Sequence, residues 1–290
     1  MKSDSRIQQG GSITRRDFVA GAMLLGAAGS AIRLEAALTA SGIDHVNIRV
    51  PDVQRSADFY IKLFGTVVSR SPNAKAQTQN PDSPSGVLWF VQTGQNNLAI
   101  SPTGPRLRPG IDHFCFAIAG FDGRAMRSQV ADLNHIYPDA PPNNLWVKDP
   151  VGNVIQLNGG AGASRVPGAG VGGVLVEPPG GVPRKPAFQA TRISQLTLAV
   201  QNLDPVASYY RKLLGAQAEM PQKGRFRLGQ SEFVLGPASG GESFRVGVAG
   251  FDPAAAARTL QNLGVTAEVT RDRSAVSFRD PDGIRVEIGG

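Results

Sequence analysis

The segment DHVNIRVPDVQRSADFYIKLFG at residues 44–65 returns as SQLTLAVQNLDPVASYYRKLLG at residues 194–215. Two shorter motifs also occur twice in the same order: AGFD at 119–122 and 249–252, and DPVGNVIQL at 149–157 with DPDGIRVEI at 280–288. Repeats that keep their order indicate two related domains in tandem. The length of 290 residues is sufficient for two hydrophobic cores.

The secondary structure within the first copy can be predicted from its pattern. VNIRV alternates and is rich in β-branched residues, which predicts a strand. Asp52 is suited to cap a following helix with apolar residues at helical spacing, and Gly65 ends that helix. Three short strands are expected next, in GTVVSRS, GVLWFVQT and NNLAIS.

The same order of elements is expected again within the first domain. It begins with the strand DHFCFAIA, followed by a helix over 122–133 and a weak strand near 136–140. NNLWVKD and NVIQLNG complete it as two further strands. The unit is therefore strand, helix and three strands, and the fold class is α+β.

Four segments follow from these patterns. Residues 1–40 are a leader, 41–158 the first domain, 159–190 a Gly/Pro-rich linker and 191–290 the second domain. The apolar stretch VGGVLVEP inside the linker can still dock on a domain.

The leader has the pattern of an export signal. Arg15 and Arg16 precede an apolar run at 18–31 that is too short to span a bilayer comfortably. Small residues follow, as in secretory signals, and TRRDF resembles the twin-arginine export motif. This predicts a periplasmic or secreted protein that the twin-arginine machinery exports already folded. No stable membrane span is expected after cleavage.

Charge and cysteine content exclude several classes of function. The formal charge is +7, yet the Lys and Arg residues form no run that would follow nucleic-acid phosphates. Cys115 is the only cysteine, so the chain has no intramolecular disulfide and no cysteine cluster for zinc. The expected partner is a small-molecule substrate. The sequence leaves the oligomeric state open, a homo-oligomer included.

The tetrapeptide GIDH occurs twice and holds two of the three histidines of the chain, His45 and His113. Equivalent places in a repeated unit suggest a shared partner, and imidazole is a good ligand for transition metals. Ring nitrogens that share one ion should lie roughly 3–4 Å apart. The alternative is a hydrogen-bonded pair in the core.

These motifs resemble the vicinal oxygen chelate superfamily, which includes glyoxalase I, extradiol dioxygenases and bleomycin-resistance proteins. The resemblance covers nearly all of 42–160 and 191–290. It implies tandem domains, each made of two βαβββ units that curl into a cup with a divalent metal at its base. The first-strand ligand positions fall on His45 and His113, and the metal would be iron, zinc, nickel or manganese.

The sequence departs from the family at the remaining ligand positions. Gln156 stands where the last strand usually offers a carboxylate, and Ala99 stands where glyoxalase I has another. In the second domain the histidine positions hold Gln195 and Ser243, whereas Glu287 keeps a carboxylate. The resemblance therefore implies one metal site, with His45, His113 and Gln156 as ligands, and a degenerate second domain.

Asn47 and Arg49 share a strand face with His45, because residues two apart on a strand point to the same side. They are the candidate substrate-binding residues, although Arg49 also fits a surface charge at the end of a strand. The favoured function is a metal-dependent enzyme for a small substrate with vicinal oxygens, closer to the dioxygenases than to glyoxalase. The alternative is a non-catalytic protein that sequesters a small molecule.

Overall fold

The computed structural model of the chain describes residues 38–65, 68–71, 86–104, 107–133, 144–160, 174–176 and 185–290. The export signal, His135 and the weak strand expected near 136–140 lie outside these ranges. Within them, no helix is long and apolar enough to cross a membrane.

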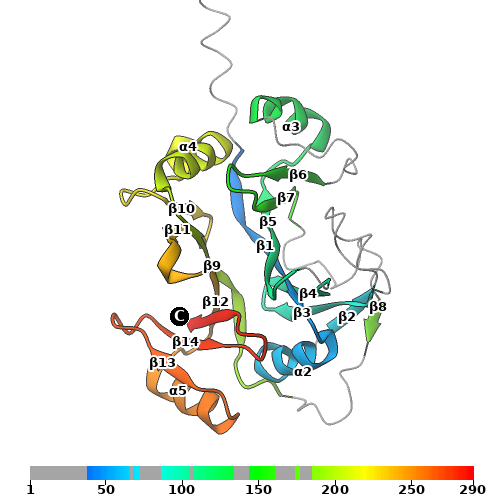
Figure 1. Cartoon of the computed structure of the whole chain (residues 1–290), viewed down its shortest axis with the longest axis vertical. Helices are drawn as coiled ribbons and strands as arrows, with labels where there is room; N and C mark the ends of the chain where they lie inside the picture. Colours follow the sequence, from blue (N-terminus) through cyan, green and yellow to red (C-terminus); the bar gives the residue numbers. More distant parts are fainter. Residues whose placement is uncertain are drawn as a thin grey trace, which may run out of the picture. The chain divides into compact units, whose positions relative to one another are not determined.

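In the described part of the chain, the first sheet has eight strands in the order β6-β7-β5-β1-β4-β3-β2-β8 (Figure 1). Their bounds are β1 Ala40–Val50, β2 Val68–Ser71, β3 Leu88–Thr93, β4 Asn96–Pro102, β5 Gly110–Ile118, β6 Leu145–Lys148, β7 Val154–Asn158 and β8 Val174–Val176. The central pair β1 and β5 is antiparallel, and each strand has a parallel partner on its other side, β4 and β7 respectively.

The second sheet repeats this topology with seven strands over 190–289, in the order β10-β11-β9-β12-β15-β14-β13. Their bounds are β9 Ala190–Val200, β10 Arg225–Leu228, β11 Ser231–Pro237, β12 Ser243–Val248, β13 Ala267–Val269, β14 Ala275–Arg279 and β15 Arg285–Gly289. Again the two central strands, β9 and β12, are antiparallel and flanked by the parallel partners β11 and β15.

The helices are α2 Val53–Phe64, α3 Gly123–Gln129, α4 Leu203–Leu214 and α5 Pro253–Asn262, with short 3-10 turns at Ala131–Leu133, Ala216–Ala218 and Ala238–Gly240. Asp52 caps α2 as expected, because its carboxylate accepts from the Arg55 backbone N–H. The helix ends at Gly65, where a Cβ would lie 2.4 Å from the Gln92 carbonyl oxygen. Glycine is therefore required there by close backbone approach.

The element order confirms the predicted fold class of tandem domains built from strand, helix and three strands. The helix expected over 122–133 is shorter, since α3 ends at Gln129 and a 3-10 turn follows. The third unit consists of β9, α4, β10 and β11. In place of a further strand beside β10, it has an isolated bridge between Glu219 and Phe226.

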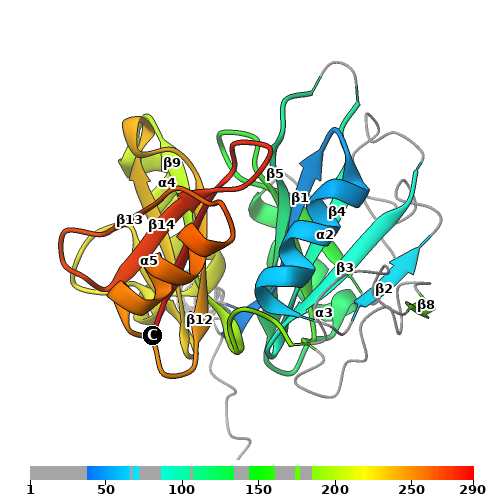
Figure 2. The same cartoon turned by 90° about the horizontal axis from the view of Figure 1, so that it is seen from below.

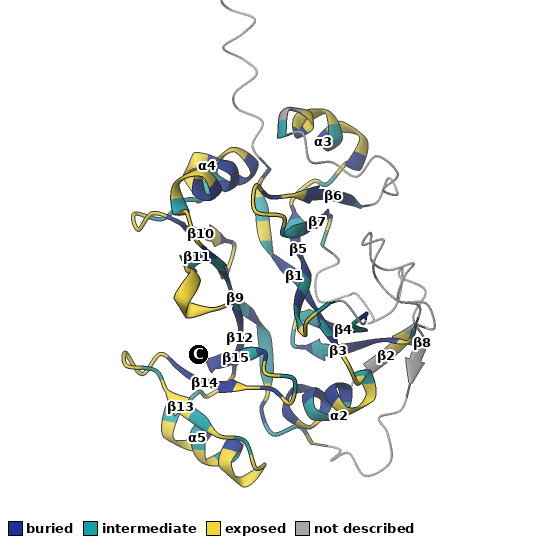
Figure 3. Cartoon of the chain, in the orientation of Figure 1, coloured by how far each residue is buried: buried dark blue, intermediate teal, exposed yellow. Residues whose placement is uncertain are grey.

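The two sheets share one hydrophobic core (Figures 2 and 3). Phe114 and Phe116 of β5 pack on Phe233 of β11, with ring centroids 5.8 and 5.3 Å apart. The face of each sheet that carries these residues is turned toward the other sheet. The opposite face of the first sheet, which carries His45, therefore points away from the shared core.

The ends of the leader and linker contact the fold. The N–H of Leu38, a residue that is 2% exposed, donates to the Leu213 carbonyl, and β1 already begins at Ala40. Residues 38–40 of the predicted leader therefore belong to the folded unit. In the linker, β8 pairs with β2 and the Ala187 N–H bonds the end of α2.

Candidate functional site

Two rows of side chains cross the outward face of the first sheet. Strand register places His45 opposite Cys115, and Cys115 opposite Gln156. In the neighbouring row, Asn47 lies opposite both His113 and Ala99. His45, Asn47, His113 and Gln156 thus belong to one surface, and His113 lies diagonally between His45 and Gln156.

The two histidines meet through their outer nitrogens. His45 Nε2 lies 3.3 Å from His113 Nε2, with the ring planes at 86°. This separation falls within the 3–4 Å expected for two ligands of one ion. The His113 side chain is 2% exposed and that of His45 is 14% exposed.

An aspartate holds the other nitrogen of each ring. His45 Nδ1 donates to Asp44 Oδ1 at 3.1 Å, and His113 Nδ1 donates to Asp112 Oδ2 at 2.8 Å. Asp44 and Asp112 both lie at register shifts in the pairing of β1 with β5. Such bulges turn the carboxylate toward the histidine that follows it.

Sequence reasoning missed these aspartates, although both belong to the GIDH motif. Strict alternation along a strand places neighbouring residues on opposite faces, so Asp44 and Asp112 were not expected beside the rings. The repetition of the whole tetrapeptide, rather than of the histidine alone, was the signal that could have found them.

Burial and charge fix the protonation of this cluster. Burial lowers the pKa of His113, and the nearby Asp112 offsets only part of that effect. Burial alone would raise the pKa of Asp112, but His113 and Arg49 together lower it below its usual value. At neutral pH, Asp112 is a carboxylate and His113 a neutral imidazole protonated on Nδ1.

The facing nitrogens fit a cation. When both Nδ1 atoms donate to carboxylates, both Nε2 atoms carry lone pairs that repel at 3.3 Å unless a proton or a metal ion lies between them. An ion about 2.1 Å from each nitrogen would subtend an angle of about 104°, close to tetrahedral. Carboxylates behind histidine ligands are the usual support of such sites.

The two candidate substrate-binding residues are held by neighbours. Arg49 Nη1 donates to Asp112 at 3.1 Å and its Nε donates to the Arg108 carbonyl at 3.0 Å. Asn47 is buried, and its Oδ1 accepts from the Ser101 hydroxyl at 2.8 Å. Arg49 therefore anchors the aspartate behind His113.

Gln156, the third candidate ligand, is also engaged. Its amide nitrogen donates to Asn144 Oδ1 at 2.7 Å, and its side chain is buried. Trp146 lies opposite Gln156 in the register and packs edge-on against His113, with centroids 4.9 Å apart. Trp146 thus lines the site.

An apolar wall lies on the neighbouring strands β4 and β3 of the same sheet. Leu88, Phe90 and Ala99 form a small buried cluster separate from the main core. Ala99 lies opposite Phe90 on one side and Asn47 on the other. The neighbouring Trp89 belongs instead to the main core.

The equivalent face of the second sheet carries an ion-pair network. Arg245 occupies the place of Cys115, opposite Gln195, and donates from Nε and Nη2 to Glu287 at 3.0 and 2.8 Å. Arg285 Nη2 donates to the other oxygen of Glu287 at 3.0 Å. Two guanidinium groups neutralise this carboxylate, so it is poorly suited to bind a cation.

Family comparison agrees with the motif resemblance. Residues 42–157 match the profile of the Glyoxalase/Bleomycin resistance protein/Dioxygenase superfamily, which supports the superfamily assignment of this part of the chain. None of the curated proteins compared with the chain matches it.

Solved structures share the fold across most of the chain. The 2,3-dioxygenase LapB from Pseudomonas sp. KL28 is 15% identical, with a TM-score of 0.57 over 88% of this chain and 93% of that one. BphC, a halotolerant catechol dioxygenase, is 17% identical, with a TM-score of 0.59 over 87% of each chain. The Mn(II)-bound glyoxalase from Novosphingobium aromaticivorans is 13% identical, with a TM-score of 0.58 over 87% of this chain and 82% of that one. At these identities the likeness establishes the fold alone.

Proposed function

We propose that the chain is a divalent-metal-dependent enzyme that acts on a small substrate with two neighbouring oxygens. The observation that carries this proposal is the pair of Nε2 atoms 3.3 Å apart, each on a ring whose Nδ1 is fixed by an aspartate. This arrangement supplies two neutral nitrogen donors aimed at one point. A divalent ion bound there would act as a Lewis acid on the paired oxygens of the substrate.

Dioxygenase-like chemistry fits the residues around this point better than glyoxalase chemistry. Ala99 gives no carboxylate and belongs to the apolar wall with Leu88 and Phe90. Such a wall suits an aromatic ring lying beside the histidines. Iron, zinc, nickel and manganese all remain candidates for the ion. One of the similar structures is named as a 2,3-dioxygenase and another as a catechol dioxygenase.

A sequestering protein is the second candidate. The observation in its favour is that Gln156 replaces a carboxylate and donates to Asn144. As a sequestering protein, the chain would bind an aromatic compound on the face between Trp146 and the apolar wall and would catalyse no reaction of it.

Metal content per chain tests the proposal. The parent, His45→Ala, Gln156→Glu and the control Gln195→Ala would be dialysed against a weak chelator. Gln195 occupies the place of His45 in the second sheet, so its replacement should leave metal content unchanged. His45→Ala should release the metal, and Gln156→Glu should tighten retention by adding negative charge beside the cation.

Oxygen uptake with a panel of catechols then separates the two candidates. The iron-loaded parent should consume oxygen, and His113→Ala treated in the same way should not. If the parent and all variants retain equally little metal while a small aromatic ligand still binds each, the sequestering function replaces the enzymatic one.

A further inference from the structure

Cys115 lies at the centre of the residue row that carries the histidine site. It is opposite His45 on one side and opposite Gln156 on the other. We infer that the Cys115 thiolate, and not the Gln156 amide, is the third protein ligand of the cation. This inference rests on the proposed function, because it assumes that His45 and His113 bind a metal.

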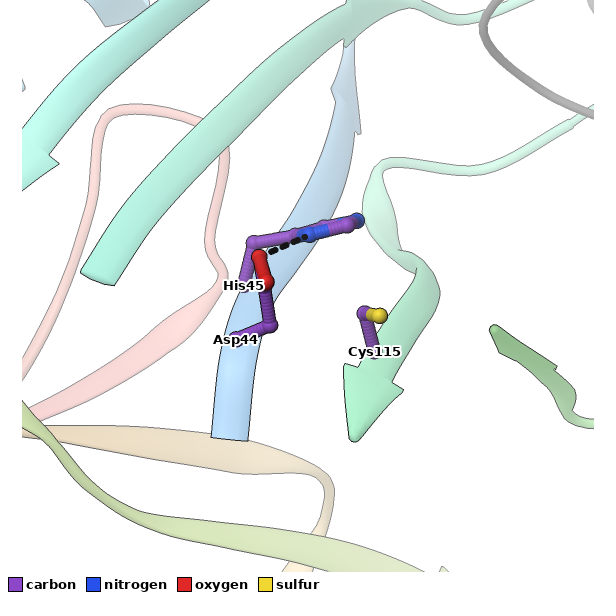
Figure 4. A group of neighbouring side chains, drawn as sticks. All are labelled: Asp44, His45 and Cys115. Carbon is purple, nitrogen blue, oxygen red and sulfur yellow. Dashed lines mark hydrogen bonds and ion pairs between the residues drawn. The ribbon is translucent and has the colours of Figure 1, made fainter. Parts of the chain in front are cut away.

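The position of the sulfur supports this assignment. The Cys115 Sγ, a ring nitrogen of His45 and a carboxylate oxygen of Asp44 all lie within 4.8 Å of one another. Figure 4 shows the sulfur on the neighbouring strand β5, apart from the His45 ring, whereas the Asp44 carboxylate bonds the inner nitrogen of that ring. Asp44 therefore supports the ring from behind, which leaves Cys115 as the other possible ligand of this group.

The distance is within reach of coordination. Ligand bonds of roughly 2.3 Å to sulfur and 2.1 Å to nitrogen place the two donor atoms about 3.6 Å apart at a tetrahedral angle. The sulfur lies within 4.8 Å of a ring nitrogen of His45, so metal binding has to draw these two atoms together by no more than about 1.2 Å. The thiol also donates to the Phe116 carbonyl at 3.7 Å, a weak hydrogen bond that metal binding would break.

Gln156 is the poorer donor for two reasons. Its amide nitrogen is directed at Asn144, so turning the amide costs a buried hydrogen bond. Its oxygen is neutral, and a neutral amide binds a divalent ion less strongly than an anionic ligand does.

Charge balance also favours the thiolate. Asp44 and Asp112 bring two negative charges, and the ion pair with Arg49 cancels one of them. A divalent cation would then leave one excess positive charge in a largely buried cluster, which is costly. Deprotonated Cys115 cancels that charge, whereas Gln156 cannot.

In the second sheet, the position equivalent to Cys115 carries a positively charged side chain. Arg245 stands at the Cys115 position, opposite Gln195 and next to Glu287. There the central place of the row is cationic and pairs with a carboxylate, so the row is poorly suited to bind a cation. The residue at this place therefore distinguishes a cation-binding row from an ion-paired one.

A thiolate ligand predicts both a metal preference and a spectrum. Softer ions such as zinc and cobalt should be favoured over manganese. Cobalt(II) added to the metal-free parent should produce a sulfur-to-cobalt charge-transfer band in the near ultraviolet. Cys115 is the only cysteine, so such a band has one source.

Matched variants complete the test. Cys115→Ser, which nearly keeps the side-chain volume, should lose the band and bind zinc about 10- to 100-fold more weakly. Gln156→Ala should keep the band and nearly all of the affinity. The parent spectrum needs no substitution, so the test does not depend on the folding of a variant.

The outcomes separate this inference from the proposed function. If cobalt binds in a His45-dependent way without the band, and Gln156→Ala weakens it, the third ligand is Gln156 and the metal site stands. If the parent binds no cobalt at all, both the inference and the metal-dependent function are wrong.

Discussion

Asp44 and Asp112 each determine the orientation of the histidine ring that follows them in the sequence. Each fixes the Nδ1 of the histidine that follows it and leaves Nε2 directed at its partner. The histidine pair could be predicted from the repeated GIDH motif. The same repeat contains the aspartates, but strand alternation does not place them beside the rings, because a bulge shifts the alternation at each of them. Bulges depend on pairing between strands and have no clear signature in one strand.

Asp112→Asn tests this support directly. It keeps the shape of the side chain but removes the charge behind His113, and zinc affinity should fall about 10- to 100-fold. Asp44→Asn should act in the same direction on His45. Competition with a chromophoric chelator measures both, with Asp204→Asn on the surface as the control. An unchanged affinity in both aspartate variants would mean that the carboxylates do not support ligands.

At the scale of elements, helices α2 and α4 are each hydrogen-bonded to an Asp-Pro turn in the other half of the chain. Tyr60 of α2 donates to Asp280 in the turn before β15 at 2.7 Å, and Tyr210 of α4 donates to Asp149 in the turn before β7 at 3.0 Å. The sequence could not predict that these tyrosines and turns meet, because nothing local encodes contacts between distant repeats.

Tyr60→Phe should destabilise the fold by about 1–3 kcal/mol, since Asp280 loses a buried donor. Burial raises the pKa of Asp280, and the hydrogen bond from Tyr60 counteracts part of that rise. A raised folded pKa provides stability that is fully present below the unfolded value and is lost as the pH rises through the folded value. Removing the hydrogen bond raises the pKa further, so the loss should be larger at neutral pH than near about pH 4.

Urea unfolding of the parent and Tyr60→Phe at both pH values measures this difference. Tyr210→Phe removes the matching hydroxyl from α4 and should cost a similar amount at neutral pH. An equal loss at both pH values for Tyr60→Phe would show that Asp280 does not titrate with folding.

At the scale of the whole molecule, the two halves hold each other through reciprocal contacts. Gly94 in the β3–β4 turn is so close to Thr191 that a Cβ would lie 2.0 Å from its carbonyl oxygen, and Gly229 approaches Ser41 in the same way at 2.1 Å. Tandem repetition and the order of elements could be predicted from sequence. The pairing of these turns with the opposite first strand could not, because it appears only once both sheets have formed.

The need for folding before metal binding bears on the proposed export of the chain. His45 and His113 come together only after β1 and β5 have paired. A metal ion bound in the cytoplasm would therefore have to be exported inside the folded protein. The twin-arginine route carries folded chains, and we propose that Arg15 and Arg16 direct the protein to it. We also propose that the two domains, with limits 41–158 and 191–290, fold together as one unit before transport.

Replacing Arg15 and Arg16 by Lys should retain the folded, metal-loaded chain in the cytoplasm, because the charge is kept while the arginine pair is lost. Cell fractionation followed by immunoblotting measures the exported share, and Arg33→Lys, beyond the apolar run, is the control. His45→Ala should still be exported if folding rather than metal loading licenses transport. Equal export of the double variant and the parent would overturn the twin-arginine assignment, while the metal site itself would be unaffected.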